Sequence, residues 1–459
     1  SRVAKRNIAI GGQALKSTST NSQTGTIAIG YEALTALTTG ANNTAVGYES
    51  ISSLTEGYNN TAIGNQAGKS ISSTTSTDNT IVGDRAGTGG SGVMTNCTAI
   101  GSGALNGTGI RNSQLNTAIG MNSMGGSFGG TVNNNTAVGG NTMTGALNAA
   151  NDNVAVGYAS LQALTTGVNN VAVGSQAADQ ITTQSYNVYV GMNSGRYIDG
   201  GGSNVAVGYG TMASSGTAAN NTALECVAIG NSVMAAITTG GYNVGVGSNA
   251  LNDITTGAKN IAIGVETLDA LTTGGQNIAI GAHAMGTADG AEQRNIAIGD
   301  GALFDLDDGG SAGASDFNVA VGHEAGTNAT TAKSCVFIGH NAGHGNDSTA
   351  LTGDYNVAVG AESLESLTTG AYNVSLGYQA GEAQIGSSSN TFVGGRAGTD
   401  ITTGESNVAI GRDSLYTATT SGDNVCIGAN AGQTIAAGQV LTNGTVAIGR
   451  SALTALTSG

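Results

Sequence analysis

A five-residue pattern of alternating polar and apolar residues recurs along the whole chain. Asn260-Ile261-Ala262-Ile263-Gly264 is one copy, and twenty-five copies, aligned on the closing glycine, lie between Asn7 and Gly449. Thirteen of the twenty-four intervals between copies are seventeen residues long, and none is shorter. A fixed short period is typical of proteins in which each repeat packs only on its neighbours. The spacing therefore predicts one structural unit for each repeat.

Within each copy, numbered from its Asn as position one, the pattern is that of a β-strand. Position two is β-branched in every copy, and position four is Ile or Val in all but one, Leu376. Alternation at period two predicts a strand in which positions two and four share a face. We expect that face to line the core, and position three, which is Ala in eighteen copies, to face outward. The predicted core and bend residues are Asn260, Ile261, Ile263 and Gly264 in one copy and Val154, Val156 and Gly157 in another.

The rest of the repeat predicts one circuit of a solenoid. The invariant glycine at position five indicates a bend, and Asn at position one, present in twenty copies, predicts a ladder of side-chain amides. We expect a second extended segment across positions eight to thirteen and a turn at position fifteen. Together these features predict an all-β fold, a parallel β-solenoid of about 25 coils. A strand-plus-helix horseshoe is the alternative, because segments such as 32–37 have fair helix propensity.

Unbroken periodicity predicts a single continuous β-solenoid over residues 1–459, without a domain boundary. The coils are less regular over 65–153, and longer intervals predict loop insertions near 209–229, 300–321, 340–359 and 429–448. Such insertions bulge from a solenoid as surface loops, where recognition is most often found. Candidate recognition residues in these loops are Asp307, Asp308, Asn346 and Asp347, with neutral surface variation as the alternative.

Composition narrows the possible partners. The chain has 29 acidic and 14 basic residues, a net charge of −15, which disfavours nucleic acid and anionic membranes. It contains no run of eighteen apolar residues and no signal-peptide pattern at its start, so we expect no membrane insertion. The sequence begins without Met and stops inside a repeat, so a processed or trimmed portion of a longer chain stays an open alternative.

Residues that often carry chemistry are scattered rather than convergent. Cys97, Cys226 and Cys335 replace Asn at position one, and Cys426 replaces Ala at position three, so we interpret them as unpaired structural residues. His323 and His340 occupy position six of consecutive coils and are expected to lie side by side, but they lack further ligands at metal-binding spacing. The P-loop pattern GxxxxGK[ST] is absent, and glycine is so frequent that other glycine-based matches carry no information. We expect no enzyme activity, no cofactor and no metal.

The five-residue block resembles the S/N-V-A-I-G repeat in the head domains of YadA-type trimeric autotransporter adhesins, as Asn153-Val154-Ala155-Val156-Gly157 illustrates. It is also similar to the NTAIG and NTAVG repeat arrays of tail-fibre-like proteins of bacteriophages. The resemblance implies a left-handed parallel β-roll and assembly into trimers. The repeat here is longer than that of the YadA-type heads.

These observations predict a non-enzymatic structural fibre that is extracellular, on a cell surface or on a virion, and that presents loops to a host surface or glycan. We expect a homo-oligomer, either a trimer or an end-to-end filament. A self-assembling extracellular filament or matrix protein is the alternative function. A minor alternative is an ice-binding solenoid, because Thr-Thr pairs such as Thr255-Thr256 recur, although adjacent threonines in a strand face opposite sides.

Overall fold

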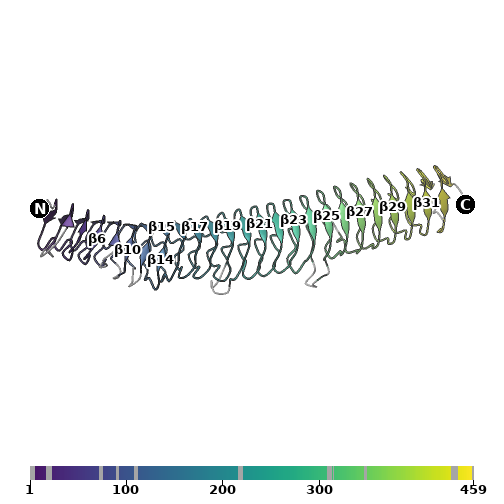
Figure 1. Cartoon of the computed structure of the whole chain (residues 1–459). Coiled ribbons are helices and arrows are strands. Elements are labelled where there is room, and N and C mark those ends of the chain that lie inside the picture. Colours follow the sequence, from purple (N-terminus) through teal and green to yellow (C-terminus); the bar gives the residue numbers. More distant parts are fainter. Residues whose placement is uncertain are drawn as a thin grey trace. The chain divides into compact units, whose positions relative to one another are not determined.

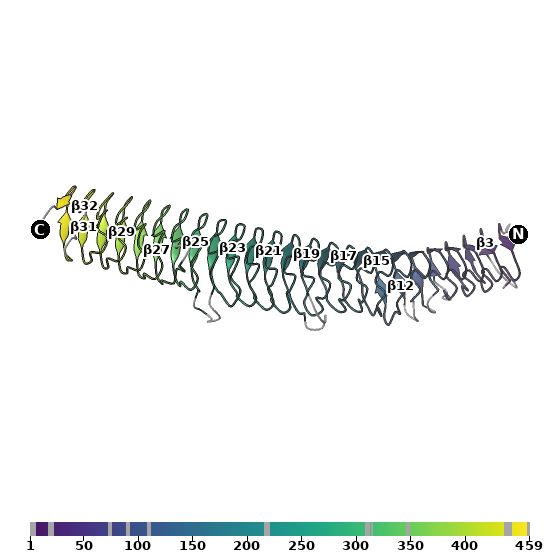
Figure 2. The same ribbon diagram turned by 180° about the vertical axis from the view of Figure 1, so that it is seen from behind.

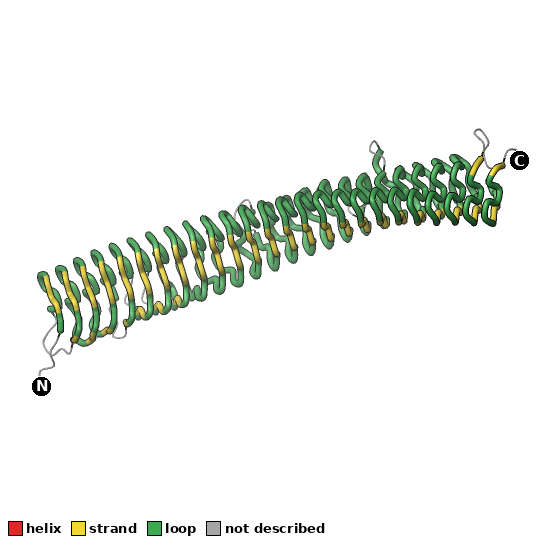
Figure 3. Tube along the Cα trace, turned by 90° about the horizontal axis from the view of Figure 1, so that it is seen from above, coloured by secondary structure: helices red, strands yellow, loops and turns green. Residues whose placement is uncertain are grey.

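The computed structural model describes residues 6–16, 23–71, 76–88, 92–107, 112–214, 221–307, 313, 315–345, 349–435 and 443–456. It is all-β, a parallel β-solenoid of about 24 turns with a repeat of about 17 residues. No helix occurs among the described residues, which excludes the strand-plus-helix horseshoe for them (Figure 3). In this part of the chain there is accordingly no helical segment of the length and apolarity that a bilayer span requires.

The chain forms two compact units, Ser1–Cys226 and Val227–Gly459, and each is a solenoid by itself. The single continuous solenoid over 1–459 stays a prediction. In the first unit, the repeated block forms three-residue strands: β1 (Ile8–Ile10), β3 (Ile27–Ile29), β5 (Thr44–Val46), β7 (Thr61–Ile63), β9 (Thr80–Val82), β11 (Thr98–Ile100), β13 (Thr117–Ile119), β15 (Thr136–Val138), β16 (Val154–Val156), β17 (Val171–Val173), β18 (Val188–Val190) and β19 (Val205–Val207) (Figure 1).

The second unit continues the same pattern. Its three-residue strands are β20 (Val227–Ile229), β21 (Val244–Val246), β22 (Ile261–Ile263), β23 (Ile278–Ile280), β24 (Ile296–Ile298), β25 (Val319–Val321), β26 (Val336–Ile338), β27 (Val357–Val359), β28 (Val374–Leu376), β29 (Thr391–Val393), β30 (Val408–Ile410), β31 (Val425–Ile427) and β33 (Val446–Ile448). Within each unit, Figure 2 shows these strands side by side, one from each turn.

Shorter two-residue strands lie elsewhere on the coil. Those of the first unit lie three and two residues before position one of the next coil: β2 (Gln23–Thr24), β4 (Gly40–Ala41), β6 (Gly57–Tyr58), β8 (Ser76–Thr77), β10 (Met94–Thr95), β12 (Ser113–Gln114) and β14 (Val132–Asn133). In the second unit, β32 (Thr434–Ile435) pairs with β34 (Ala455–Leu456).

Neighbouring strands are parallel and in register, so equivalent positions of the repeat stack on one another. Ile261, Ala262 and Ile263 pair with Ile278, Ala279 and Ile280. The register also holds across the irregular coils, where Thr98 pairs with Thr117. A parallel ladder in this register bonds each strand to both neighbours, which a single coil cannot do alone.

The structure reverses the predicted orientation of the strand. Ala262 at position three is completely buried, whereas Ile263 is 40% exposed and Ile261 only partly buried. Val154 and Val156 likewise lie on the outer face, around buried Ala155. The inward set is therefore positions one and three, because the interior behind the strand is too narrow for two branched side chains. The assignment of Ile261, Ile263, Val154 and Val156 to the core was wrong.

The core consists of position three together with residues from the following turn. In the coil that starts at Asn260, Ala262 packs inside with Leu268 and Leu271, and all three are fully buried. The extended segment expected across positions eight to thirteen is wrong, because residues 265–268 form turns. Glu266 and Leu268 have left-handed backbone conformations, with φ of 51° and 52°. These turns fold the leucines back onto the strand.

Large residues at position three are accommodated by glycine at position nine. Phe392 is fully buried, and a Cβ added at Gly398 of the same coil would lie 2.7 Å from its ring. Tyr189 and Gly195 show the same relation, with 2.3 Å between the added Cβ and the ring. Positions three and nine therefore share one space in the interior. This is why position three is enclosed although it accepts both Ala and Phe.

The bend at position five requires glycine, as predicted for Gly264 and Gly157. At this position φ lies between +121° and +145° in all twenty-five copies, a region that side chains rarely adopt. A Cβ at Gly264 would also lie 2.4 Å from the carbonyl oxygen of Gly281 in the next coil. Both the conformation and the close approach of the coils exclude a side chain.

Replacing Gly394 with Ala is expected to lower the free energy of unfolding by about 2 kcal/mol or more, because it combines backbone strain with a 2.7 Å contact to the backbone of Gly411. Urea denaturation followed by circular dichroism measures the change. Gly395→Ala is the matched control, since a Cβ there meets nothing within 4 Å, and its effect should stay within about 0.5 kcal/mol. Equal effects of the two variants would contradict the close-approach explanation.

A second prediction concerns the shared core volume. Phe392→Ala should destabilise the fold by about 3–5 kcal/mol through the cavity it leaves. Gly398→Leu should also destabilise it, because the new side chain overlaps the phenyl ring. The double variant recreates the Ala262 and Leu268 arrangement and should recover at least half of the summed loss in a double-mutant cycle. Purely additive effects would show that the two positions do not share one space.

Candidate interaction face

The interior ladder of asparagines fixes the strand that carries the candidate interaction face. The backbone N–H of Asn260 donates to Asn243 Oδ1 at 2.9 Å, and Asn277 repeats the bond to Asn260 Oδ1 at 3.1 Å. Asn260 Nδ2 also donates to the carbonyl of Gly274 at 2.9 Å, on the far side of the same coil. The Asn260 side chain therefore ties its coil to a neighbouring coil and closes its own circuit, as the ladder prediction requires.

Three cysteines take the place of asparagine in this ladder. Cys335 N–H donates to Asn318 Oδ1 at 3.0 Å, and its Sγ lies 3.4 Å from the Gly353 carbonyl. The N–H of Asn356 points at the same sulfur, 3.4 Å away. All four cysteines are buried, and none of them forms a disulfide bond. Burial raises the pKa of Cys335 to about 12 and that of Cys426 to about 11.

The outer face of the strands is an apolar strip that continues along each unit. Ile263, Ile280 and Ile298 on successive strands are 40%, 36% and 37% exposed. Position two alongside them is only partly buried in most strands. Positions two, three and four carry no charged residue in any copy. Further isoleucines at position four that are exposed in the same way are Ile63, Ile100, Ile119, Ile229, Ile338 and Ile410.

Aromatic side chains stack along both edges of this strip. At position six, Tyr31 and Tyr48 stack with ring centroids 5.6 Å apart. Directly before position one of the next coil, Tyr355 and Tyr372 stack with ring centroids 5.1 Å apart. His323 and His340 stack at 5.5 Å, which confirms that they lie side by side. We call positions two, four and six, together with the residue directly before position one, the outer strand face.

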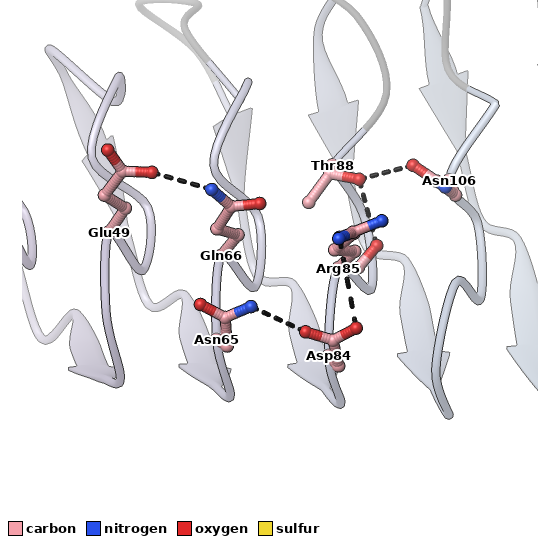
Figure 4. A network of polar contacts seen from close by, with 7 residues as sticks. All are labelled: Glu49, Asn65, Gln66, Asp84, Arg85, Thr88 and Asn106. Atoms are coloured by element: carbon pink, nitrogen blue, oxygen red, sulfur yellow. Dashed lines mark hydrogen bonds and ion pairs between the residues drawn. The ribbon is translucent and has the colours of Figure 1, made fainter.

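Polar residues at position six and beyond it link successive coils. In Figure 4, Gln66 Nε2 donates to Glu49 Oε2 at 2.8 Å, and Asn65 Nδ2 donates to Asp84 Oδ1 at 2.7 Å. Thr88 donates to Asn106 in the next coil. These side chains satisfy one another and surround the apolar strip with a polar margin, an arrangement typical of interaction surfaces.

The threonine pairs lie on another side of the coil. The hydroxyl of Thr255 at position thirteen donates to the Thr272 carbonyl at 3.0 Å, and Thr238 repeats the bond to Thr255 at 3.0 Å. Thr256 at position fourteen is exposed. One hydroxyl of each pair is therefore used inside the fold, and one rank of threonines faces outward.

Two carboxylate clusters that sequence spacing did not reveal lie among the described residues. Asp289, Glu292 and Asp307 form one, and Glu362, Glu365 and Glu382 form the other, with oxygen atoms within 4.8 Å of one another in each. Each cluster joins residues of two coils. Of the predicted recognition residues, Asp307 belongs to the first cluster, whereas Asp308, Asn346 and Asp347 lie outside the described residues.

The fold defines the chain as a repeat protein of the parallel β-solenoid class. No known family model matches the sequence, and no curated protein sequence matches it.

The replacement of a ladder asparagine by Cys335 predicts that the free energy of unfolding depends on pH. Because the pKa of Cys335 is raised from about 9 to about 12 in the fold, its stabilising contribution is complete below pH 9 and is lost as pH rises towards 12. Cys335→Asn should raise the free energy of unfolding by about 1 kcal/mol at pH 7 through regained hydrogen bonds. It should also flatten the loss of stability between pH 9 and 12, measured by urea denaturation. An unchanged alkaline slope would show that Cys335 does not contribute.

Proposed function

We propose that the chain is a non-enzymatic structural fibre protein, extracellular or virion-associated, whose copies associate side by side through the outer strand face. The observation that carries this proposal is the exposure of isoleucine at position four on successive strands. Monomeric soluble proteins rarely expose contiguous apolar patches larger than a few hundred Å². An apolar strip with one isoleucine, valine or leucine from each coil indicates a surface that is covered in the assembled protein.

A second copy of the same chain is the occupant that fits this face best. The side chains repeat at the strand separation of about 4.8 Å, and a partner with the same period can pack against every one of them. Positions two and four of this face carry no charged residue that would require an oppositely charged partner. Covering one half-exposed isoleucine contributes roughly 1 kcal/mol, and many strands in each unit add to that contribution.

The resemblance to the YadA-type head repeats and to phage fibre arrays supports a trimer of left-handed rolls. In such an assembly the outer strand faces of three copies meet along a common axis. The turns and insertions then face the surroundings, where they are free to contact a host surface or glycan. The regular coils provide length and stiffness, and the departures from the repeat provide recognition.

Removing the apolar character of three adjacent strands tests this association. The triple variant carries Ile263→Thr, Ile280→Thr and Ile298→Thr. Its strands keep β-branched residues, so the fold should remain. We expect the dissociation constant of the oligomer to rise at least about tenfold, because each site loses roughly 1 kcal/mol. Sedimentation equilibrium measures the constant, and circular dichroism checks the fold.

Ile385→Thr is the control, because Ile385 is an exposed hydrophobic residue at position thirteen, outside the outer strand face. It should leave the oligomer unchanged. A monomeric wild-type chain, or a triple variant that associates as strongly as the wild type, would refute the side-by-side proposal. Indefinite filaments in electron micrographs, retained by the triple variant, would instead favour the end-to-end filament.

A further inference from the structure

We propose that a surface pocket beside Phe304, in the second unit, binds a small organic ammonium ion. The pocket has a volume of about 280 Å³ and is lined by His283, Asp300, Gly301, Phe304, Glu324 and Thr327, from three successive coils. The inference goes beyond the proposed function, since the groups that form the pocket belong to a single chain and need no association of copies.

Two glycines make the pocket. Phe304 at position ten lies over Gly286 of the preceding coil, where an added Cβ would be 2.8 Å from its ring. The phenyl ring meets the imidazole of His283 edge to face, with centroids 6.2 Å apart. Gly301 at position seven stands between His283 and Glu324, which occupy the same position in the adjoining coils. Most other coils carry a side chain there, so Gly301 leaves an opening.

The floor of the opening is held by hydrogen bonds between successive coils. Thr327 Oγ1 donates to the Gly301 carbonyl at 3.1 Å, and Thr287 Oγ1 donates to the Phe304 carbonyl at 2.7 Å. The Gly301 backbone has φ of +65°, and an added Cβ there would approach only Glu324 Cγ, at 3.4 Å. The pocket is therefore shaped by fixed backbone.

The charges of the pocket favour a cation. Asp300 and Glu324 contribute two carboxylates, and no lysine or arginine lines the pocket. His283 Nδ1 lies 3.4 Å from Glu266, and His323 Nδ1 lies 3.7 Å from Glu324, so each imidazole has a carboxylate beside it. An ammonium group near an aromatic ring and carboxylates gains both cation–π and ionic attraction. An anionic ligand would be repelled.

Saturation-transfer difference NMR on the full chain tests the pocket. The probes are glucosamine, Nα-acetyl-lysine amide and tetramethylammonium, each compared with glucose at matched ionic strength. We expect signals from ammonium probes and none from glucose. Glucosamine without the lysine derivative would assign the site to an amino sugar, and the reverse would assign it to a lysine side chain; either result supports an ammonium site.

Three variants locate the binding. Glu324→Gln and Asp300→Asn should each weaken it about three- to fivefold, the factor that an exposed charge pair supplies. Gly301→Gln should abolish it by filling the opening, and Gln66 and Gln176 adopt the same left-handed backbone at position seven in other coils. Glu32→Gln, the same charge change at position seven of a distant coil, should have no effect.

Two outcomes would overturn the proposal. Equal signals from glucose and glucosamine would show that the charge has no role. Binding that survives Gly301→Gln, or that Glu32→Gln weakens as much as Glu324→Gln does, would show attraction to the overall negative charge of the chain. A circular dichroism spectrum unchanged from the wild type shows that each variant is folded, so that a lost signal reports on the pocket.

Discussion

The close, in-register stacking of coils is the constraint on which the rest of the structure depends. A three-residue strand makes few hydrogen bonds within its own coil, so its backbone groups must pair with the coils on either side. At the bend the approach is close, and an added Cβ on Gly264 would lie 2.4 Å from the carbonyl oxygen of Gly281. Glycine at position five and asparagine at position one follow from this single requirement.

The same stacking limits the width of the interior. Only one residue of each strand, at position three, points inward beside the ladder asparagine, and it is usually alanine. A larger residue such as Phe392 or Tyr189 is present where position nine has become glycine. A narrow core has little room for large side chains, which explains why only 4% of the residues are aromatic. Buried leucines come from the turns, which left-handed backbone conformations direct inward.

Shape and recognition are divided between the regular and irregular parts of the chain. The regular strands place isoleucine and valine outward at a constant spacing, which suits a partner with the same period. Departures from the repeat create local features, and the pocket beside Phe304 exists because glycine occurs at Gly286 and Gly301. A solenoid accommodates such changes because each coil contacts only its neighbours, so a local change leaves distant coils intact.

The sequence by itself determined the solenoid, its period, the glycine bend and the asparagine ladder, because each of these depends on backbone pairing that repeats with the chain. It also placed His323 beside His340 through their shared position in consecutive coils. Alternation alone did not decide which strand face is inside, because apolar residues occupy both faces of this strand. Only the tertiary structure showed that Ala262 is enclosed and Ile263 is exposed, because the width of the interior depends on how the turns fold back. The tertiary structure alone also brought together Asp289, Glu292 and Asp307, because Asp307 lies in the coil after the one that contains the other two.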